Sequence, residues 1–87
     1  MSVYVDDMAA EYGRMIMFHM VADSTEELLA MVDRIRVSRK WIQHPSTYKE
    51  HFDICLSKRA LAVEAGAVEI TQREYAKRIR ARRTVLQ

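Results

Sequence analysis

The sequence has few of the residues that build special loops and cross-links. Of its 87 residues only two are glycine, one is proline and one is cysteine. With Cys55 alone the chain cannot form an internal disulfide, so we expect a reducing compartment, of which the cytoplasm is the simplest. Two isolated glycines, Gly13 and Gly66, cannot form the glycine-rich loop that cradles phosphates. P-loop and dinucleotide-binding proteins are therefore excluded.

Long hydrophobic runs are also missing. The longest, residues 15–22, is interrupted by His19 and falls far short of the ~20 residues that span a bilayer. No basic segment followed by an apolar one opens the chain, so we expect neither a signal peptide nor a membrane partner. The composition, 49% hydrophobic and 30% charged, is typical of a single soluble globular domain.

Hydrophobic periodicity predicts seven elements. Residues 15–22 are apolar on both faces, which indicates a strand in the middle of a covered sheet. Capping-box spacing, Ser24 to Glu27 and Thr71 to Glu74, predicts the starts of two helices. In order, the predicted elements are strands at 3–7 and 15–22, a helix at 25–36, a strand at 51–54, a helix at 58–65 capped by Ser57 and ended by Gly66, a strand at 68–70, and a helix from 72 to about 83.

This order predicts an α/β fold. Two of the connections carry helices, which permits parallel neighbouring strands. We expect one domain over residues 1–87, with a three- or four-stranded, mostly parallel sheet and about three helices. Residues 42–50 lack a clean period and are predicted to form a long loop, and residues 72–87 a basic C-terminal helix and tail.

Charge is unevenly distributed along the chain. Residues 1–72 hold 8 Lys and Arg against 11 Asp and Glu, a balance of −3, whereas residues 73–87 hold 6 against 1, a balance of +5. Arginines on a helix bind phosphates, so the final helix is a candidate nucleic-acid contact; an ordinary solvated face is the alternative. The candidate residues are Arg73, Lys77, Arg78, Arg80 and Arg82.

A second candidate site combines histidines with carboxylates. His51 and Asp53 are two residues apart, which places both on one face of a strand. Together with His19 and Asp6 they form a set of N and O ligands for a divalent metal such as Mg²⁺, Mn²⁺ or Zn²⁺. Alternatively, His19, His51 and Asp53 are catalytic acid–base groups, or His19 is a core histidine and Asp53 caps a turn.

Acidic residues that follow predicted strands are candidate ligand-binding residues. In parallel sheets, ligands bind at the carboxyl ends of strands, which nominates Asp6, Asp7 and Asp23. Carboxylates clustered there suit Mg²⁺ or Mn²⁺ with a phosphate substrate. For Asp23 the simpler interpretation is that it precedes a helix, whose N-terminus favours negative charge.

Several short motifs together resemble a known family. They are Val3-Tyr4-Val5-Asp6-Asp7, Gly13, His19 with Asp23, Glu27-Leu28, Trp41, His51-Phe52-Asp53, Arg59 and Gly66-Ala67. This combination, which covers nearly the whole chain, resembles a bacterial and phage domain of unknown function, family 4031. Met8, Met17 and Leu29 depart from the family's usual residues. The resemblance adds Arg59 to the ligand-binding candidates and implies no activity.

The sequence leaves several functions open. The first is a cytoplasmic binding domain, encoded by a phage or a bacterium, for a phosphorylated ligand, a nucleic acid or a protein partner. The alternative is a metal-dependent phosphoester hydrolase that uses the clustered Asp and His residues. A homo-oligomer whose interface includes Trp41 is a third, because so small a core leaves apolar surface to cover.

Overall fold

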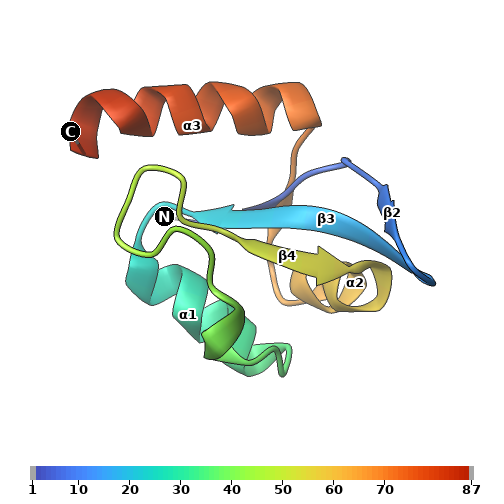
Figure 1. Ribbon diagram of the computed structural model, residues 1–87. Helices are drawn as coiled ribbons and strands as arrows, with labels where there is room; N and C mark the ends of the chain where they lie inside the picture. Colours follow the sequence, from blue (N-terminus) through green and yellow to red (C-terminus); the bar gives the residue numbers. More distant parts are fainter. Residues whose placement is uncertain (1, 87) are drawn as a thin grey trace.

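The computed structural model describes residues 2–86, which form a five-stranded mixed sheet with helices on both faces (Figure 1). The strands are β1 (Val3–Val5), β2 (Ala10–Tyr12), β3 (Met15–Ala22), β4 (Phe52–Cys55) and β5 (Val68–Glu69). Met17 pairs with both β2 and β4, and Met20 pairs with both β1 and β4. Therefore β1 and β2 share one edge of β3, β4 lies on the other edge, and β5 extends the sheet beside β1.

The prediction of a mostly parallel sheet with three or four strands is wrong. Strand β3 is antiparallel to β1, β2 and β4, and only β1 and β5 run parallel. For β2 and β3 the cause is local, because the two strands are joined by a two-residue turn with Gly13 at φ +60°. Such a short connection joins only antiparallel strands. Strand β2 was not predicted because three residues are too few to show a period.

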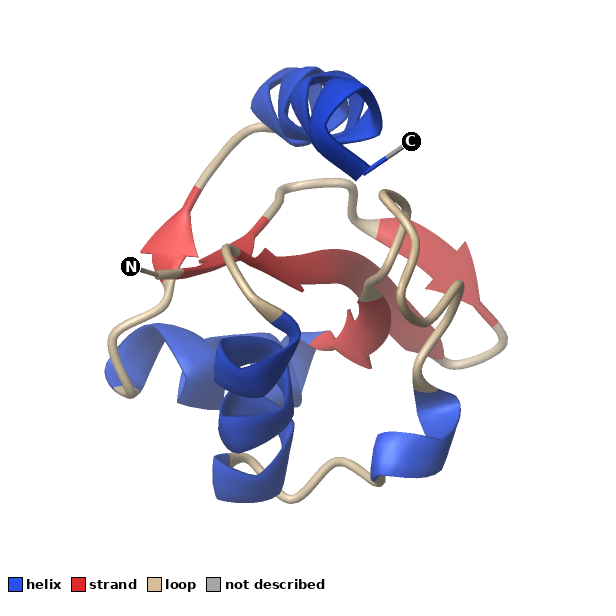
Figure 2. Ribbon diagram, turned by 90° about the vertical axis from the view of Figure 1, so that its left-hand side faces the viewer, coloured by secondary structure: helices blue, strands red, loops and turns tan. Residues whose placement is uncertain are grey.

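The helices form separate layers on the two faces of the sheet. Helices α1 (Thr25–Arg34) and α2 (Leu56–Glu64) cover one face, and α3 (Gln72–Leu86) lies across the other (Figures 1 and 2). The core fills the space between the sheet and α1 and α2. Its largest fully buried side chains are those of Phe52, Met20, Leu28, Ile35 and Ile54. Both faces of β3 are therefore covered, as its double apolar pattern predicted.

Both predicted capping boxes mark helix starts. At α1, the Glu27 N–H donates to Ser24 Oγ at 3.2 Å, and the Ser24 hydroxyl, rather than its backbone N–H, donates to Glu27 Oε1 at 2.8 Å. At α3 the box is complete, since the Glu74 N–H donates to Thr71 Oγ1 and the Thr71 N–H donates to the Glu74 carboxylate. These bonds satisfy N–H groups that a helix start leaves without partners.

Helix α2 differs from its prediction at one end. It begins at Leu56, directly after β4, and Ser57 lies inside it rather than capping it. Leu61 is 45% exposed, while Ala62 is buried. Its C-terminal end agrees with the prediction, because Gly66 follows the last turn at φ +107°, a conformation that favours glycine.

The segment 42–50, predicted as a loop, follows a short 3₁₀ helix, η1 (Arg39–Trp41). Gln43 forms a β-bridge with His51. The buried Glu50 carboxylate accepts from Thr25 Oγ1 at 2.7 Å and from the Ser46 N–H at 2.8 Å, which joins this segment to the start of α1.

Gln87, the end of the predicted basic tail, lies outside the described residues. Within residues 2–86, no helix combines the length and the apolar character that crossing a bilayer requires.

Arg36 tests how much a left-handed backbone conformation costs in stability. It follows α1 at φ +63°, and the Val37 N–H bonds to the Val32 carbonyl across it. Left-handed backbone costs a non-glycine residue ~1–2 kcal/mol, and glycine costs ~0.4–1 kcal/mol through the entropy of the unfolded chain. Arg36→Gly is therefore expected to raise the free energy of unfolding by up to about 1 kcal/mol in urea denaturation. The matched control, Gly66→Ala, should lower it by about 1 kcal/mol; a loss of stability in both variants would contradict this account.

Candidate metal centre

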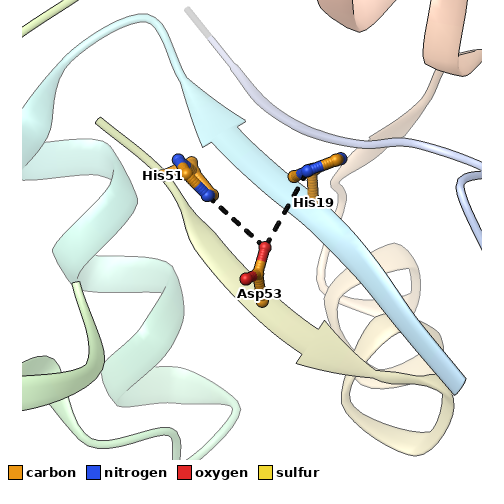
Figure 3. A group of neighbouring side chains, drawn as sticks. All are labelled: His19, His51 and Asp53. Carbon is orange, nitrogen blue, oxygen red and sulfur yellow. Dashed lines mark ion pairs between the residues drawn. The ribbon is translucent and has the colours of Figure 1, made fainter. Parts of the chain in front are cut away.

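His19, His51 and Asp53 converge on the face of the sheet that α3 covers (Figure 3). His19 and Asp53 are paired directly in the register between β3 and β4, so their side chains point to the same face. His51, two residues before Asp53, points to that face as well. We call these three residues the His–Asp cluster. The candidate ligand atoms of the cluster all lie within 4.8 Å of one another.

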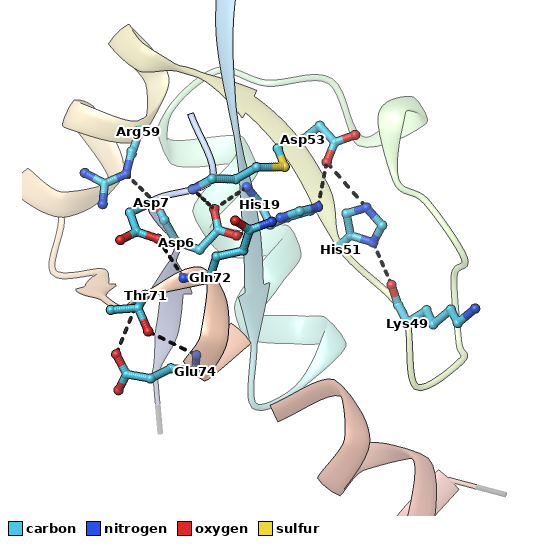
Figure 4. Close-up of polar contacts among 11 residues, drawn as sticks. Asp6, Asp7, His19, Lys49, His51, Asp53, Arg59, Thr71, Gln72 and Glu74 are labelled. Carbon is cyan, nitrogen blue, oxygen red and sulfur yellow. Dashed lines mark hydrogen bonds and ion pairs between the residues drawn. The ribbon is translucent and has the colours of Figure 1, made fainter. Parts of the chain in front are cut away.

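Each imidazole of the cluster is anchored through its Nδ1 atom. His19 Nδ1 lies 2.7 Å from Asp6 Oδ2, and His51 Nδ1 lies 2.7 Å from the carbonyl oxygen of Lys49 (Figure 4). A carboxylate and a carbonyl only accept hydrogen bonds, so each Nδ1 carries a proton. In the neutral rings, each Nε2 is then left with a free lone pair directed toward Asp53. This is the arrangement of metal-binding histidines, whose second nitrogen is held by a carboxylate or a carbonyl.

Asp6 is fully buried behind His19. Its Oδ1 atom accepts from the backbone N–H of His19 at 2.8 Å and from that of Met8 at 3.2 Å. Burial raises the pKa of Asp6, but the hydrogen bonds from His19 and Met8 outweigh it and hold the pKa below its usual value. Asp6 is therefore a carboxylate that orients His19. It lies on the opposite side of the ring from Asp53, in contrast to its predicted position among the ligands.

Asp53 has one satisfied oxygen and one that is not. Oδ2 accepts from Gln43 Nε2 at 2.6 Å. Oδ1 is buried and has no well-aligned donor within the described chain, although His51 Nε2 lies 3.4 Å away and His19 Nε2 lies 4.0 Å away. A buried carboxylate oxygen without a hydrogen bond is rare in folded proteins and calls for an explanation. Two ligands each ~2 Å from a tetrahedral zinc ion are ~3.3 Å apart, which matches the 3.4 Å separation and is shorter than the 4.0 Å one.

The ionised Asp53 carboxylate and the protonated His51 imidazole stabilise each other. The His51 imidazole, 3.4 Å away, lowers the pKa of Asp53 more than burial raises it. Burial lowers the pKa of His51, but its contacts with Asp53 and the Lys49 carbonyl raise it by more, so the net shift is upward. A carboxylate is thus held ready to bind positive charge, either a proton on His51 or a metal cation.

A cleft of ≈450 Å³ opens beside the cluster, between α3, β3 and the 42–50 loop. It is lined by His19, His44, Lys49, His51, Gln72, Tyr75, Ala76, Ile79 and Arg80. The Tyr75 ring stacks on His19, with the ring centres 4.3 Å apart and the planes 7° from parallel. Burial, with the nearby charges of Asp6 and Asp53, raises the pKa of Tyr75 to about 12, so its phenol is neutral. No residue of the lining is acidic, and Lys49 and Arg80 are cationic, so the cleft favours an anionic ligand.

Three other predicted ligand-binding residues use their polar groups in hydrogen bonds within the protein. Asp7 Oδ1 accepts from the backbone N–H of the first residue of α3 at 2.6 Å, and Asp23 accepts from the Tyr4 hydroxyl at 3.0 Å. Arg59 Nε donates to the backbone carbonyl of Asp6 at 2.8 Å (Figure 4). Asp7, Asp23 and Arg59 are absent from the lining of the cleft and hold α3, the N-terminal strand and α2 in position.

The predicted nucleic-acid contacts divide between the two sides of α3. Arg78 lies with its guanidinium carbon 3.5 Å from the centre of the Tyr4 ring, and Arg82 donates to the carbonyl of Ala22 at 3.2 Å, so both face the sheet. Arg73, Lys77 and Arg80 are exposed.

Sequence reasoning missed four residues around the cluster. Gln43, His44 and Lys49 lie in the 42–50 loop, which has no period from which a side-chain direction could be read. Tyr75 lies on α3, and its stacking on His19 depends on where the helix lies across the sheet. The one available signal was the close spacing of His44, Lys49 and His51 along the chain.

The fold and the cluster define a small α/β domain with a histidine–aspartate centre beneath a covering helix. The chain belongs to the family described as "Protein of unknown function (DUF4031)", whose sequence model matches residues 3–82. No curated protein and no solved structure matches the chain. The matched region contains the whole His–Asp cluster and the residues that line the cleft. Because the family carries no assigned activity, the function must be argued from the geometry.

The pairing of Asp6 with His19 predicts a pH-dependent contribution to stability. Asp6→Ala leaves buried donors of His19 and Met8 without an acceptor, and should lower the free energy of unfolding by about 2–3 kcal/mol at pH 7. Because the pKa of Asp6 is lowered from 3.8, its contribution is present above that value and is lost as the pH falls below it. The stability gap between wild type and variant, measured by urea denaturation without metal, should narrow at pH 3. An equal gap at both pH values would contradict the prediction.

Proposed function

We propose that the His–Asp cluster binds a divalent transition-metal ion and that the protein is a metal-dependent phosphoester hydrolase. The observation that carries this proposal is the buried Asp53 Oδ1, which lies between two Nε2 atoms and has no aligned donor within the described chain. A cation bound by all three atoms removes the energetic cost of burying that oxygen without a hydrogen bond. The fixed Nδ1 bonds of both histidines support the same proposal.

The donor set favours Zn²⁺ over Mg²⁺ and Mn²⁺. Imidazole nitrogen suits zinc and later transition metals, whereas Mg²⁺ prefers carboxylate, carbonyl and water oxygens. Catalytic zinc sites have three protein ligands and keep a fourth position for water. In this arrangement Asp6 and the Lys49 carbonyl orient the two histidine ligands, and the fourth position opens on the cleft.

The chemistry follows from that fourth position. Zinc lowers the pKa of a bound water to ~7, which supplies a hydroxide at neutral pH, with the proton released to solvent. The hydroxide oxygen forms a bond to phosphorus, and the bond from phosphorus to the ester oxygen breaks. The departing oxygen takes a proton from solvent to give an alcohol, and the phosphate product leaves. The cationic Lys49 and Arg80 side chains favour entry of the anionic ester.

The non-catalytic function considered from sequence uses the same cleft. A domain that binds a phosphorylated ligand through the metal and the cationic lining, without turnover, needs no further residue. The cytoplasm remains the expected compartment, because the single cysteine is free and no internal disulfide is available to the chain.

Metal titration of untagged, metal-free protein tests the proposed centre. We expect one equivalent of Zn²⁺ by calorimetry and, with Co²⁺ as a spectroscopic probe, the visible absorption of a tetrahedral site. His51→Ala and Asp53→Ala each remove a ligand, and affinity should fall by at least ~100-fold. His44→Ala, which removes a nearby histidine outside the cluster, is the matched control and should retain the affinity. Similar losses in all three variants, or no binding by wild type, would refute the metal centre.

The hydrolytic activity is tested separately with p-nitrophenyl phosphate and bis(p-nitrophenyl) phosphate. Zinc-loaded wild type should hydrolyse one of them, and chelation or Asp53→Ala should abolish the reaction. Metal binding without hydrolysis would support the non-catalytic binding function instead.

The orienting role of Asp6 predicts that Asp6→Asn weakens metal binding while largely keeping the fold. The amide oxygen of Asn still accepts the backbone N–H groups, but its NH₂ group donates to His19 Nδ1. The imidazole proton then moves to Nε2, which loses the lone pair that binds metal. We expect a 10–100-fold loss of Zn²⁺ affinity, with the altered tautomer visible in the ¹⁵N NMR shifts of His19. A tautomer shift without loss of affinity would exclude His19 as a ligand.

A further inference from the structure

Helix α3 carries a row of basic side chains on its outward side. Arg73, Lys77 and Arg80 are spaced i, i+4 and i+7, which places them on one face of the helix, and Arg83 continues the row. We call these four residues the basic ridge. All four are exposed, and none forms an ion pair with another residue of the described chain. At 1.5 Å per residue the ridge extends over ~15 Å.

The ridge differs from the other arginines of the same helix. Arg78 and Arg82 are occupied by an aromatic ring, a carboxylate and a carbonyl of the sheet. The ridge instead presents four positive charges, none of them in an ion pair, and Glu74 is the one acidic residue near them on the helix. Such a surface favours a chain of anionic groups.

The basic ridge leads into the cleft of the His–Asp cluster. Arg80 belongs to the ridge and also lines the cleft, and Lys49 lines it from the 42–50 loop. One turn beyond Arg80, at the C-terminal end of the ridge, the guanidinium of Arg83 lies 5.9 Å from the centre of the Tyr48 ring in the same loop. Inside the cleft, the ring of Tyr75 supplies a flat aromatic surface. An anionic chain that follows the ridge therefore arrives at the cluster.

We propose that the ligand of this cleft is a single-stranded nucleic acid, with successive phosphates along the basic ridge and one phosphodiester at the His–Asp cluster. The proposal of cleavage at the cluster rests on the proposed function, while that of binding along the ridge does not. The ~15 Å length of the ridge favours a polymer, because four charges spread over that distance match several successive phosphates rather than one. The cleft, at ≈450 Å³, admits one nucleotide of a flexible strand and is too small for a duplex. Stacking on aromatic rings is typical of single-strand recognition.

Binding is tested by fluorescence anisotropy with labelled 12-nucleotide RNA and DNA strands, in EDTA and with Zn²⁺. Four ridge contacts predict a salt dependence with a slope of about −3 in log K against log salt, from ~0.7 per contact. Arg73→Gln/Lys77→Gln/Arg83→Gln removes three contacts and should reduce the slope to about −1 and the affinity by at least ~100-fold. The matched control, Arg14→Gln/Arg34→Gln/Arg36→Gln, removes the same charge from exposed positions outside α3 and should change both little.

The outcomes separate this inference from the proposed function. In the Arg73→Gln/Lys77→Gln/Arg83→Gln variant, Zn²⁺ affinity and hydrolysis of the p-nitrophenyl phosphate esters should be unchanged, because none of the three substituted residues lines the cleft. Retained zinc chemistry without strand binding, equal losses in the ridge and control variants, or equally tight binding of a duplex or a mononucleotide would each overturn the inference. Strand binding in EDTA that depends on the ridge would support it even if the zinc centre failed. Circular dichroism melts verify that both triple variants are folded.

Discussion

The buried contact between Asp6 and His19 is the interaction on which the rest of the structure depends. Asp6 follows β1 immediately, and its carboxylate accepts from both the backbone and the ring of His19 in the middle of β3. Its backbone carbonyl accepts from Arg59 on α2, so one residue joins two strands and a helix. The same contact fixes the direction of the His19 ring. The geometry of the candidate centre is thus determined by a residue of the fold's interior.

Helix α3 is held on the sheet mainly by polar and aromatic contacts. Tyr75 stacks on His19, Arg78 lies on the Tyr4 ring, and Asp7 accepts from the first N–H of the helix. Its counterparts α1 and α2 instead bury aliphatic side chains against the other face. Tyr75 therefore has two roles, because it packs the helix against the sheet and also lines the cleft. The small apolar stripe of α3 is sufficient because the sheet offers rings and carboxylates to its arginines.

Much of the fold could be predicted from local patterns, and the pairing of strands could not. Capping boxes at Ser24 and Thr71, the two-sided apolar strand and Gly66 marked element boundaries, because each depends on neighbours in the chain. The sheet order depends on which strands meet. The short turn at Gly13 makes β2 antiparallel to β3, and β4 also pairs antiparallel with β3 although a helix connects them. For the candidate centre, the two-residue period placed His51 with Asp53. The register that brings His19 opposite Asp53 is a tertiary property, as is the position of Asp6 behind the ring.

The proposed metal ligands come from two strands that are neighbours in space but distant in the chain. Strand β4 lies at the edge of the sheet, with one of its sides unpaired within the described residues, and edges of this kind are where small sheets open and recruit foreign strands. An ion held by His19 on β3 and by Asp53 on β4, with His51 directly before β4, would cross-link these two paired strands. Such cross-links matter most in domains of this size, whose cores alone supply little stability. The ion would then stabilise the pairing of β3 with β4 as well as serve the chemistry of the centre.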